Sequence, residues 1–246
     1  MLNCLAIVGL GSIGRRHFRL ISEIRPDIKI IVVRSGHGSG CDEEKMATKV
    51  TNSIEGAIKE GIQAAIISSP ATLHLKQSLE LAKNGIHLLI EKPISHTSDG
   101  LMELTKVVNE NRVTVMIGYV LRYDLGAIKF KSWLDEKIKG KIIHARIECG
   151  SYLPDWRPNQ DYRKTVSALS KLGGGVLLEL SHELDYLHWF FGEPDSVQAQ
   201  IRNSKTLDID VEDQADLLIT SKQGYCISVQ IDFSRRHVER KCRVLT

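Results

Sequence analysis

The first half of the chain alternates short apolar segments with stretches of helical periodicity, and this alternation limits the fold more than any other feature of the sequence. Apolar segments of strand length occur at residues 5–8, 29–33, 64–67, 86–90 and 113–117. Helical patterns separate them, such as the one after Gly14 that repeats Phe18, Ile21 and Ile24 on one side. Apolar strands that alternate with helices predict a parallel sheet covered on both faces. We therefore predict an α/β domain with a doubly wound parallel sheet.

The pattern changes after Gly118. Apolar and polar residues alternate in the segments 143–149, 197–201, 215–219 and 225–233, which is the two-residue period of a strand with one exposed face. The turn at residues 221–224 predicts a hairpin between the last two segments. We predict a C-terminal α+β domain with a largely antiparallel sheet, and we divide the chain into domains 1–118 and 119–246.

Composition excludes several classes of protein. The 246 residues are 42% hydrophobic and 26% charged, as in an ordinary globular protein, and the net charge of +3 is too small to indicate a nucleic-acid partner. The longest apolar runs are a handful of residues, whereas a membrane helix needs about 20. The N-terminus lacks the basic region of a signal peptide, so we expect a cytoplasmic protein with no membrane partner. None of the five cysteines forms a CxxC pair, and we expect no metal site.

The segment Gly9-Leu10-Gly11-Ser12-Ile13-Gly14 is the most informative local motif. It follows an apolar strand directly and opens a helix, so its glycines allow a tight turn while the helix N-terminus faces a pyrophosphate. This context favours a Rossmann dinucleotide-binding loop over a merely structural turn. We expect cofactor contacts from five residues of the loop, namely Gly9, Gly11, Ser12, Ile13 and Gly14.

The residues after the second strand bear on the choice of cofactor. An NAD-selective fold places an acidic residue there, whereas this chain has Arg34-Ser35. Arg34 could pair with a 2′-phosphate, which favours NADP over NAD. Arg34 could equally stack on adenine and leave the choice open. We count Arg34 and Ser35 among the cofactor-binding residues.

Two further segments follow strand ends, where open α/β sheets bind their ligands. Ser69, Pro70 and His74 come after the strand at 64–67, and we expect them to line the cofactor cleft. Glu91-Lys92-Pro93 comes after the strand at 86–90, and its position predicts a functional role for Glu91 and Lys92. The alternative is an exposed charge pair followed by a proline.

A polar stripe marks an otherwise apolar helix predicted at residues 176–191, just after Gly173-Gly174-Gly175. Glu179 and His182 would share a helix face, and His182 would touch Asp185 and Tyr186 on the next turn. A histidine in such a helix is often a hydrogen-bonded core residue. The acidic residue one turn earlier and the glycine entry favour a catalytic site instead.

Four segments, in this order, resemble the landmarks of the glucose-fructose oxidoreductase, inositol dehydrogenase and rhizopine-catabolism (Gfo/Idh/MocA) family. They are the glycine loop, Glu91-Lys92-Pro93, residues 118–123 and residues 173–185. The resemblance implies an NAD(P)-dependent dehydrogenase or reductase of carbohydrate metabolism, acting on a hydroxyl or keto carbon of a sugar, cyclitol or nucleotide sugar. Lys92 would bind the reacting oxygen, His182 would transfer the proton and Glu91 would lie near the nicotinamide ribose. These roles suit hydride transfer, in which a base takes the carbinol proton while a cation stabilises the alkoxide.

The resemblance also suggests where substrate binds. We expect substrate contacts from Arg122 and Asp185, and from the loop at residues 152–163, which is rich in aromatic and arginine residues. That loop resembles members that act on surface-polysaccharide and nonulosonic-acid sugars, and Trp156, Arg157 and Tyr162 are its candidate ligands. Trp156 could instead pack under the sheet edge.

Two departures from the family pattern leave alternatives open. Glu179, our third catalytic candidate, stands three residues before His182, where the family commonly has an aspartate four residues before. Family members also continue beyond residue 246, so we expect the second domain to lack its last elements. The alternative function is a non-catalytic dinucleotide-binding regulator of the same fold. We further expect a homo-oligomer, a dimer or tetramer, formed through the second sheet.

Overall fold

The computed structural model describes residues 2–36, 40–136 and 140–246. The chain divides into two compact units, Met1–Gly118 and Tyr119–Thr246, which we call unit 1 and unit 2. The division falls where the hydrophobic pattern of the sequence changes its period. Within the described residues, every helix is too short or too polar to cross a membrane.

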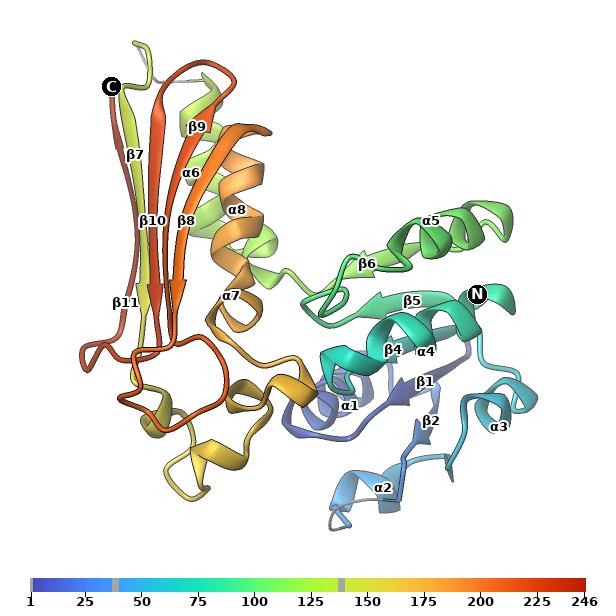
Figure 1. Cartoon of the computed structure of the whole chain (residues 1–246). Helices are drawn as coiled ribbons and strands as arrows, with labels where there is room; N and C mark the ends of the chain where they lie inside the picture. The colour runs from blue at the N-terminus through green and yellow to red at the C-terminus, as the bar shows by residue number, and fades with distance from the viewer. Residues whose placement is uncertain (1, 37–39, 137–139) are drawn as a thin grey trace. The chain divides into compact units, whose positions relative to one another are not determined.

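Unit 1 is a six-stranded parallel sheet with helices beside it (Figure 1), in the strand order β3-β2-β1-β4-β5-β6. Its strands are β1 (Cys4–Val8), β2 (Lys29–Val33), β3 (Lys49–Thr51), β4 (Ala64–Ile67), β5 (His87–Ile90) and β6 (Val115–Ile117). Its helices are α1 (Ser12–Ile24), α2 (Asp42–Met46), α3 (Ile54–Lys59), α4 (Ala71–Lys83) and α5 (Leu101–Glu110). The short elements β3, α2 and α3 have no clear periodicity, and the sequence pattern did not predict them.

Both faces of this sheet are buried. Every residue of β1 is buried, and its side chains alternate between two cores because successive residues of a strand point to opposite faces. Ala6 and Val8 pack in the core that includes Leu81 and Leu104 of α4 and α5. Leu5 and Ile7 pack with Phe18 of α1 in the other. This double burial explains why β1 is apolar without interruption.

Unit 2 is a five-stranded mixed sheet with helices on one face (Figure 1), in the strand order β11-β7-β10-β9-β8. Its strands are β7 (His144–Gly150), β8 (Pro194–Arg202), β9 (Gln214–Ser221), β10 (Cys226–Asp232) and β11 (Glu239–Leu245). Only β7 and β10 pair in parallel among these strands. The main helices are α6 (Leu125–Glu136), α7 (Val176–Glu179) and α8 (Ser181–Phe191), and short 3-10 turns lie at Val120–Tyr123 and between Leu153 and Leu172. The predicted doubly wound α/β plus largely antiparallel α+β architecture is confirmed.

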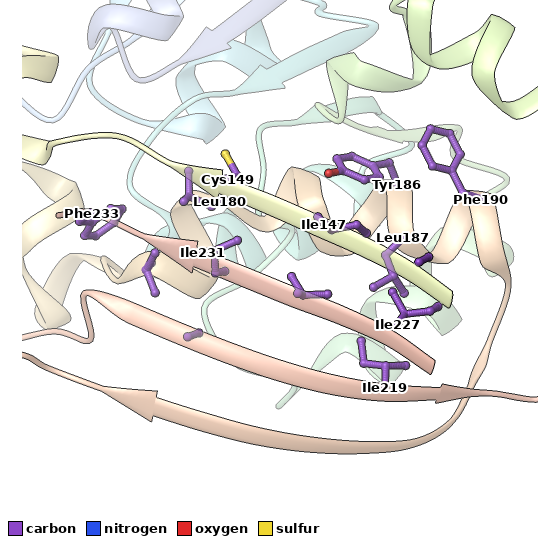
Figure 2. Close-up of a cluster of buried hydrophobic side chains, with 14 of the residues drawn as sticks. Ile147, Cys149, Leu180, Tyr186, Leu187, Phe190, Ile219, Ile227, Ile231 and Phe233 are labelled. Atoms are coloured by element: carbon purple, nitrogen blue, oxygen red, sulfur yellow. The ribbon is translucent and has the colours of Figure 1, made fainter. Parts of the chain in front are cut away.

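The alternation in the second half sorts side chains between the two faces of this sheet. Ile147 of β7 and Ile227 of β10 point to the helix side, where Figure 2 shows them beside Tyr186 and Leu187 of α8. Polar neighbours such as Arg146 and Gln230 line a hollow of about 560 Å³ on the other face. The two-residue period therefore corresponds to one buried and one exposed face.

The helix predicted at residues 176–191 is interrupted. Leu180 lies between α7 and α8 with φ −97° and ψ 27°, outside regular helix geometry. The bond from the Leu180 amide to the Val176 carbonyl closes α7, and the Glu183 amide then bonds the Leu180 carbonyl at the start of α8. Glu179 and His182 therefore lie on different helices, and the prediction that they share one helix face was wrong.

Candidate active site

The glycine loop between β1 and α1 is packed tightly against the end of β4 at two of its three glycines. Gly9 has φ +90°, and a Cβ there would lie 2.8 Å from the Ser69 amide nitrogen. A Cβ at Gly14 would overlap the Gly9 carbonyl oxygen and lie 2.7 Å from Ser68 Oγ. Both positions therefore require glycine for packing alone.

Gly11 differs from the other two glycines because a Cβ there would meet no described atom within 4 Å. Gly11 is the N-cap of α1, and Ser12 and Ile13 form the exposed first turn of this helix. No side chain of the described residues caps the helix, and its first turn contains no acidic residue. The open space and the uncapped N–H groups together form a surface that suits an anion such as a pyrophosphate.

Arg34, after β2, forms an ion pair with Glu44 of α2. Partial burial opposes ionisation of Glu44, but the hydrogen bond and charge of Arg34 outweigh it and lower the pKa of this carboxyl. Arg34 and Glu44 line a hollow of about 590 Å³ together with Lys49 and Thr51, while the neighbouring Ser35 is exposed. Glu44 could not be predicted as the partner of Arg34, because nothing in the local sequence links the two residues ten positions apart.

His74 occupies a different place from the one we predicted. Its side chain is only 1% exposed, and both ring nitrogens are bonded within the protein. Nδ1 lies 2.8 Å from the Pro93 carbonyl oxygen and Nε2 lies 2.8 Å from the Ser69 carbonyl oxygen. His74 therefore joins the loops after β4 and β5, and its buried ring has no surface left for a direct cofactor contact. Ser69 and Pro70 are partly exposed beside it, and Ser69 Oγ donates to Gln77 Oε1 at 2.6 Å.

Glu91 is fixed at the carboxyl end of β5. Its Oε1 accepts a hydrogen bond of 2.7 Å from His17 Nε2, and its Oε2 lies 3.3 Å from the Lys92 amide nitrogen. Burial alone would raise the pKa of Glu91, but His17 and Lys92 lower it overall. A Cβ at Gly118 would lie 3.0 Å from Glu91 Oε2, so Gly118 leaves room for the carboxylate. Sequence reasoning did not single out His17, although this residue lies one turn after the glycine loop.

Unit 2 brings together a second set of predicted residues where the turn Val120–Tyr123 meets α8. Arg122 binds Asp185 through two atoms, with Nε 2.9 Å from Oδ2 and a terminal nitrogen 2.9 Å from Oδ1. The Tyr119 ring meets the His182 ring edge-on at 5.7 Å between centroids. His182 is partly exposed and lies outside the buried core cluster of α8. Arg122 and Asp185, both predicted to bind substrate, are thus bound to each other beside His182.

Glu183 of α8 is a fully buried acidic residue that the helical pattern does not predict to be functional. Its side chain is 0% exposed, and Arg240 of β11 donates from Nε to its Oε1 at 2.6 Å. Burial, reinforced by the Glu183 charge, raises the pKa of the neighbouring Cys149 thiol to about 12. Arg240, in the basic segment 235–243, therefore supplies a partner for a buried charge.

The aromatic side chains of the loop at residues 152–163 make contacts within unit 2. Trp156 donates from Nε1 to Ser151 Oγ at 2.7 Å, and its ring meets Phe233 edge-on. Tyr162 donates from its hydroxyl to the Leu207 carbonyl at 2.8 Å, whereas Arg157 is exposed. The geometry favours the alternative that Trp156 packs beneath the sheet, and it leaves Arg157 as the accessible candidate of the three.

The triglycine before α7 is explained by close packing. A Cβ at Gly174 would overlap the Val166 carbonyl oxygen, and a Cβ at Gly175, where φ is +113°, would overlap the Glu212 carboxylate. Glu212 Oε1 accepts a bond from the Leu177 amide at 3.2 Å. These glycines therefore allow Glu212 to cap α7, the short helix that ends at Glu179.

Family models match both units of the chain. Residues 4–119 match a model described as the oxidoreductase family with an NAD-binding Rossmann fold, and residues 128–245 match the GFO/IDH/MocA C-terminal domain. The chain belongs to the Gfo/Idh/MocA family. The predicted family is confirmed. The N-terminal part of the chain has the NAD-binding Rossmann fold of this family.

The relatives act on several substrates. The chain is 25% identical to an inositol 2-dehydrogenase of Acidiphilium cryptum, over 98% of this chain and 70% of that protein. It is also 25% identical to a 2,7-anhydro-N-acetylneuraminate hydratase of Mediterraneibacter gnavus, over 76% of this chain and 49% of that protein. The chain thus spans about half to 70% of the length of these relatives.

Solved structures share the fold at low identity. The WlbA dehydrogenase from Bordetella pertussis, in complex with NADH and UDP-GlcNAcA, has a TM-score of 0.87 at 19% identity, covering all of this chain and 76% of that one. The scyllo-inositol dehydrogenase from Lactobacillus casei, with NAD(H) and scyllo-inositol, has a TM-score of 0.85 at 21% identity, covering 100% of this chain and 74% of that one. At these identities the likeness establishes the fold.

Proposed function

We propose that the chain transfers a hydride between a nicotinamide dinucleotide and a hydroxyl or keto carbon of a sugar, cyclitol or nucleotide sugar. The observation that carries the proposal is the open space at Gly11 in front of the uncapped N-terminus of α1, in a chain whose two units both match this oxidoreductase family. Relatives named as inositol dehydrogenases support the substrate class.

The residues of unit 1 fit the dinucleotide. The first N–H groups of α1, at Gly11, Ser12 and Ile13, would bind the pyrophosphate, which their partial positive charge favours. Ser69 and Pro70 would line the same cleft after β4, and Glu91 would lie on the nicotinamide side after β5. When bound, the dinucleotide supplies or accepts the hydride.

Lys92 and His182 have complementary chemistry for the substrate. The Lys92 ammonium would donate a hydrogen bond to the reacting oxygen and stabilise the negative charge that develops on it. The His182 imidazole would take the hydroxyl proton in oxidation, or return it in reduction. Tyr119 and the Arg122–Asp185 pair, which lie around His182, would fix the ring. Glu179 on α7 and the exposed Arg157 stay candidates for substrate contact.

We propose that NAD(H) is the preferred cofactor. Arg34 on its own favours NADP, but Glu44 already balances its charge beside the hollow, and this weakens the attraction of Arg34 for a 2′-phosphate. The structures that share this fold with NADH bound support the same preference.

The test is turnover of purified protein with a panel of inositols, aldoses and UDP-linked sugars, followed by the absorbance of reduced nicotinamide. Lys92→Ala and His182→Asn serve as variants in which turnover should fall while NADH still binds. Dinucleotide binding without turnover of any compound would favour the regulator. Absence of binding would overturn the proposed function.

We also propose that the chain self-associates through β8, which forms one of the two edges of the unit 2 sheet. Val197 and Ile201 lie on its helix-side face, in register with Ile219 and Ala215, yet both are exposed. An edge strand with exposed apolar side chains is a typical pairing surface. Sedimentation should show a dimer or tetramer that Ile201→Lys dissociates, and a monomeric wild type would contradict this.

A further inference from the structure

The residues on the two sides of Lys92 are each held by a histidine from a different helix. His17 of α1 donates from Nε2 to the Glu91 carboxylate at 2.7 Å. His74 of α4 lies with Nδ1 2.8 Å from the Pro93 carbonyl oxygen. Lys92 thus lies on a segment of three residues whose first and last members are both anchored by imidazole rings.

We propose that His17 and His74 form a histidine clamp that positions Lys92. The clamp consists of His17, Glu91, Pro93 and His74. Neither histidine is a catalytic residue, since each acts through the residue next to Lys92. This inference rests on the proposed function for the role of Lys92, and the clamp itself is a feature of unit 1 alone.

The His17 arm connects the lysine segment to the glycine-loop helix. Glu91 Oε1 binds His17, and the other oxygen, Oε2, lies 3.3 Å from the Lys92 amide nitrogen, so one carboxylate links α1 to the Lys92 backbone. The Glu91 side chain has little freedom, because Gly118 leaves just enough room for it. Both partners are mostly buried, so the hydrogen bond is poorly screened by solvent.

The His74 arm connects the lysine segment to the loop after β4. The ring of His74 is buried and its Nε2 lies 2.8 Å from the Ser69 carbonyl oxygen, which fixes the ring while Nδ1 holds Pro93. Each ring nitrogen thus faces a carbonyl oxygen from one of the two loops. The clamp therefore joins the ends of β4 and β5.

The two arms give Lys92 a fixed place relative to the dinucleotide-binding loop. The lysine side chain is a flexible four-carbon stem, so the position of its ammonium depends on how firmly its backbone is held. A displacement of about 1 Å at a reacting group can cost about 100-fold in rate. Because α1 carries both His17 and the uncapped N-terminus at Gly11, the same helix would orient the pyrophosphate and the lysine.

The test replaces each of the two histidines once with glutamine and once with asparagine. Glutamine places its amide nitrogen near the position of Nε2, and asparagine places it near Nδ1. At position 17, His17→Gln should keep the bond to Glu91 and His17→Asn should lose it. At position 74, His74→Asn should keep the bond to Pro93 and His74→Gln should lose it. The same pair of replacements therefore has opposite expected effects at the two sites, which a general loss of packing would not produce.

The first readout is amide hydrogen exchange in the cofactor-free protein. His17→Asn should speed exchange at the Lys92 amide roughly 10- to 100-fold, as expected for loss of a hydrogen bond to a charged group, and His17→Gln should restore protection. At the other arm the readout is the carbonyl carbon resonance of Pro93, which should shift in His74→Gln because the hydrogen bond to its oxygen is lost, and should stay close to wild type in His74→Asn. Amides of β1 serve as the control for global unfolding. Equal exchange at Lys92 in the two His17 variants, or equal Pro93 resonances in the two His74 variants, would overturn the clamp.

The second readout is kinetic, with the substrate found by the panel described above. His17→Asn and His74→Gln should lower kcat at least about tenfold with a smaller change in the Kd for NADH, because the lysine would lose its alignment while the pyrophosphate site is kept. Unchanged kcat in both would overturn the positioning role. A wild type that binds no NADH would instead overturn the proposed function, and the exchange experiment would still test the clamp.

Discussion

Removing the guanidinium of Arg240 should destabilise unit 2, because it leaves the Glu183 carboxylate buried without its cation. Glu183 is 0% exposed, and the Arg240 Nε lies 2.6 Å from its Oε1. Breaking a fully buried ion pair from one side costs about 3–5 kcal/mol. The Arg240 side chain is 47% exposed, so water screens part of the interaction, and we expect about 2–3 kcal/mol for Arg240→Met.

The thermal midpoint of unit 2 should fall by about 4–12 °C, at about 2–4 °C per kcal/mol for a protein of this size. Tryptophan fluorescence is the appropriate probe, because all three tryptophans, Trp133, Trp156 and Trp189, lie in unit 2. Unfolding of unit 1 then contributes no direct tryptophan signal.

Two control variants separate charge from packing. Arg240→Lys keeps a cation and should lose less than Arg240→Met. The double variant Glu183→Gln with Arg240→Met removes both charges of the pair. It should recover a large part of the lost stability, because neither member of the pair then leaves an unpaired buried charge. A midpoint for Arg240→Met within about 1 °C of wild type would refute the reasoning, as would a double variant less stable than the single one.

Four further predictions address the proposed function and the buried thiols. Gly11→Val should fold normally, since its Cβ meets open space, but should weaken NADH binding strongly in calorimetry; unchanged binding would reject the loop as the pyrophosphate site. Glu44→Gln should improve NADP binding relative to NAD by about threefold to tenfold, and an equal effect on both would contradict the charge argument. His182→Asn should lower turnover about 10²- to 10⁴-fold with dinucleotide binding nearly intact. Burial raises the pKa of Cys149 to about 12, so this thiol stays protonated at pH 8 and should resist alkylation while the exposed Cys226 reacts; equal rates would show that Cys149 is accessible.

The sequence by itself determined the main elements of the fold. Apolar segments such as residues 5–8 and 64–67 are strands because a strand buried on both faces must be apolar throughout. The alternation at 143–149 and 225–233 marks strands with one buried face. Periods of this kind depend on a residue and its near neighbours, so they can be read without knowing the tertiary contacts. The glycine loop could be predicted for the same reason, since a strand, a tight turn and a helix follow one another in the chain.

Only the tertiary structure decided which side chains are partners. His17 meets Glu91 across 74 positions, and Glu183 meets Arg240 across 57. Such pairs depend on how strands and helices pack, which local sequence does not encode. The enclosure of His74 between two loops has the same cause, and local periodicity likewise did not show that Leu180 interrupts the predicted helix. Periodicity therefore determined the elements, and packing between distant segments determined the chemistry available at their ends.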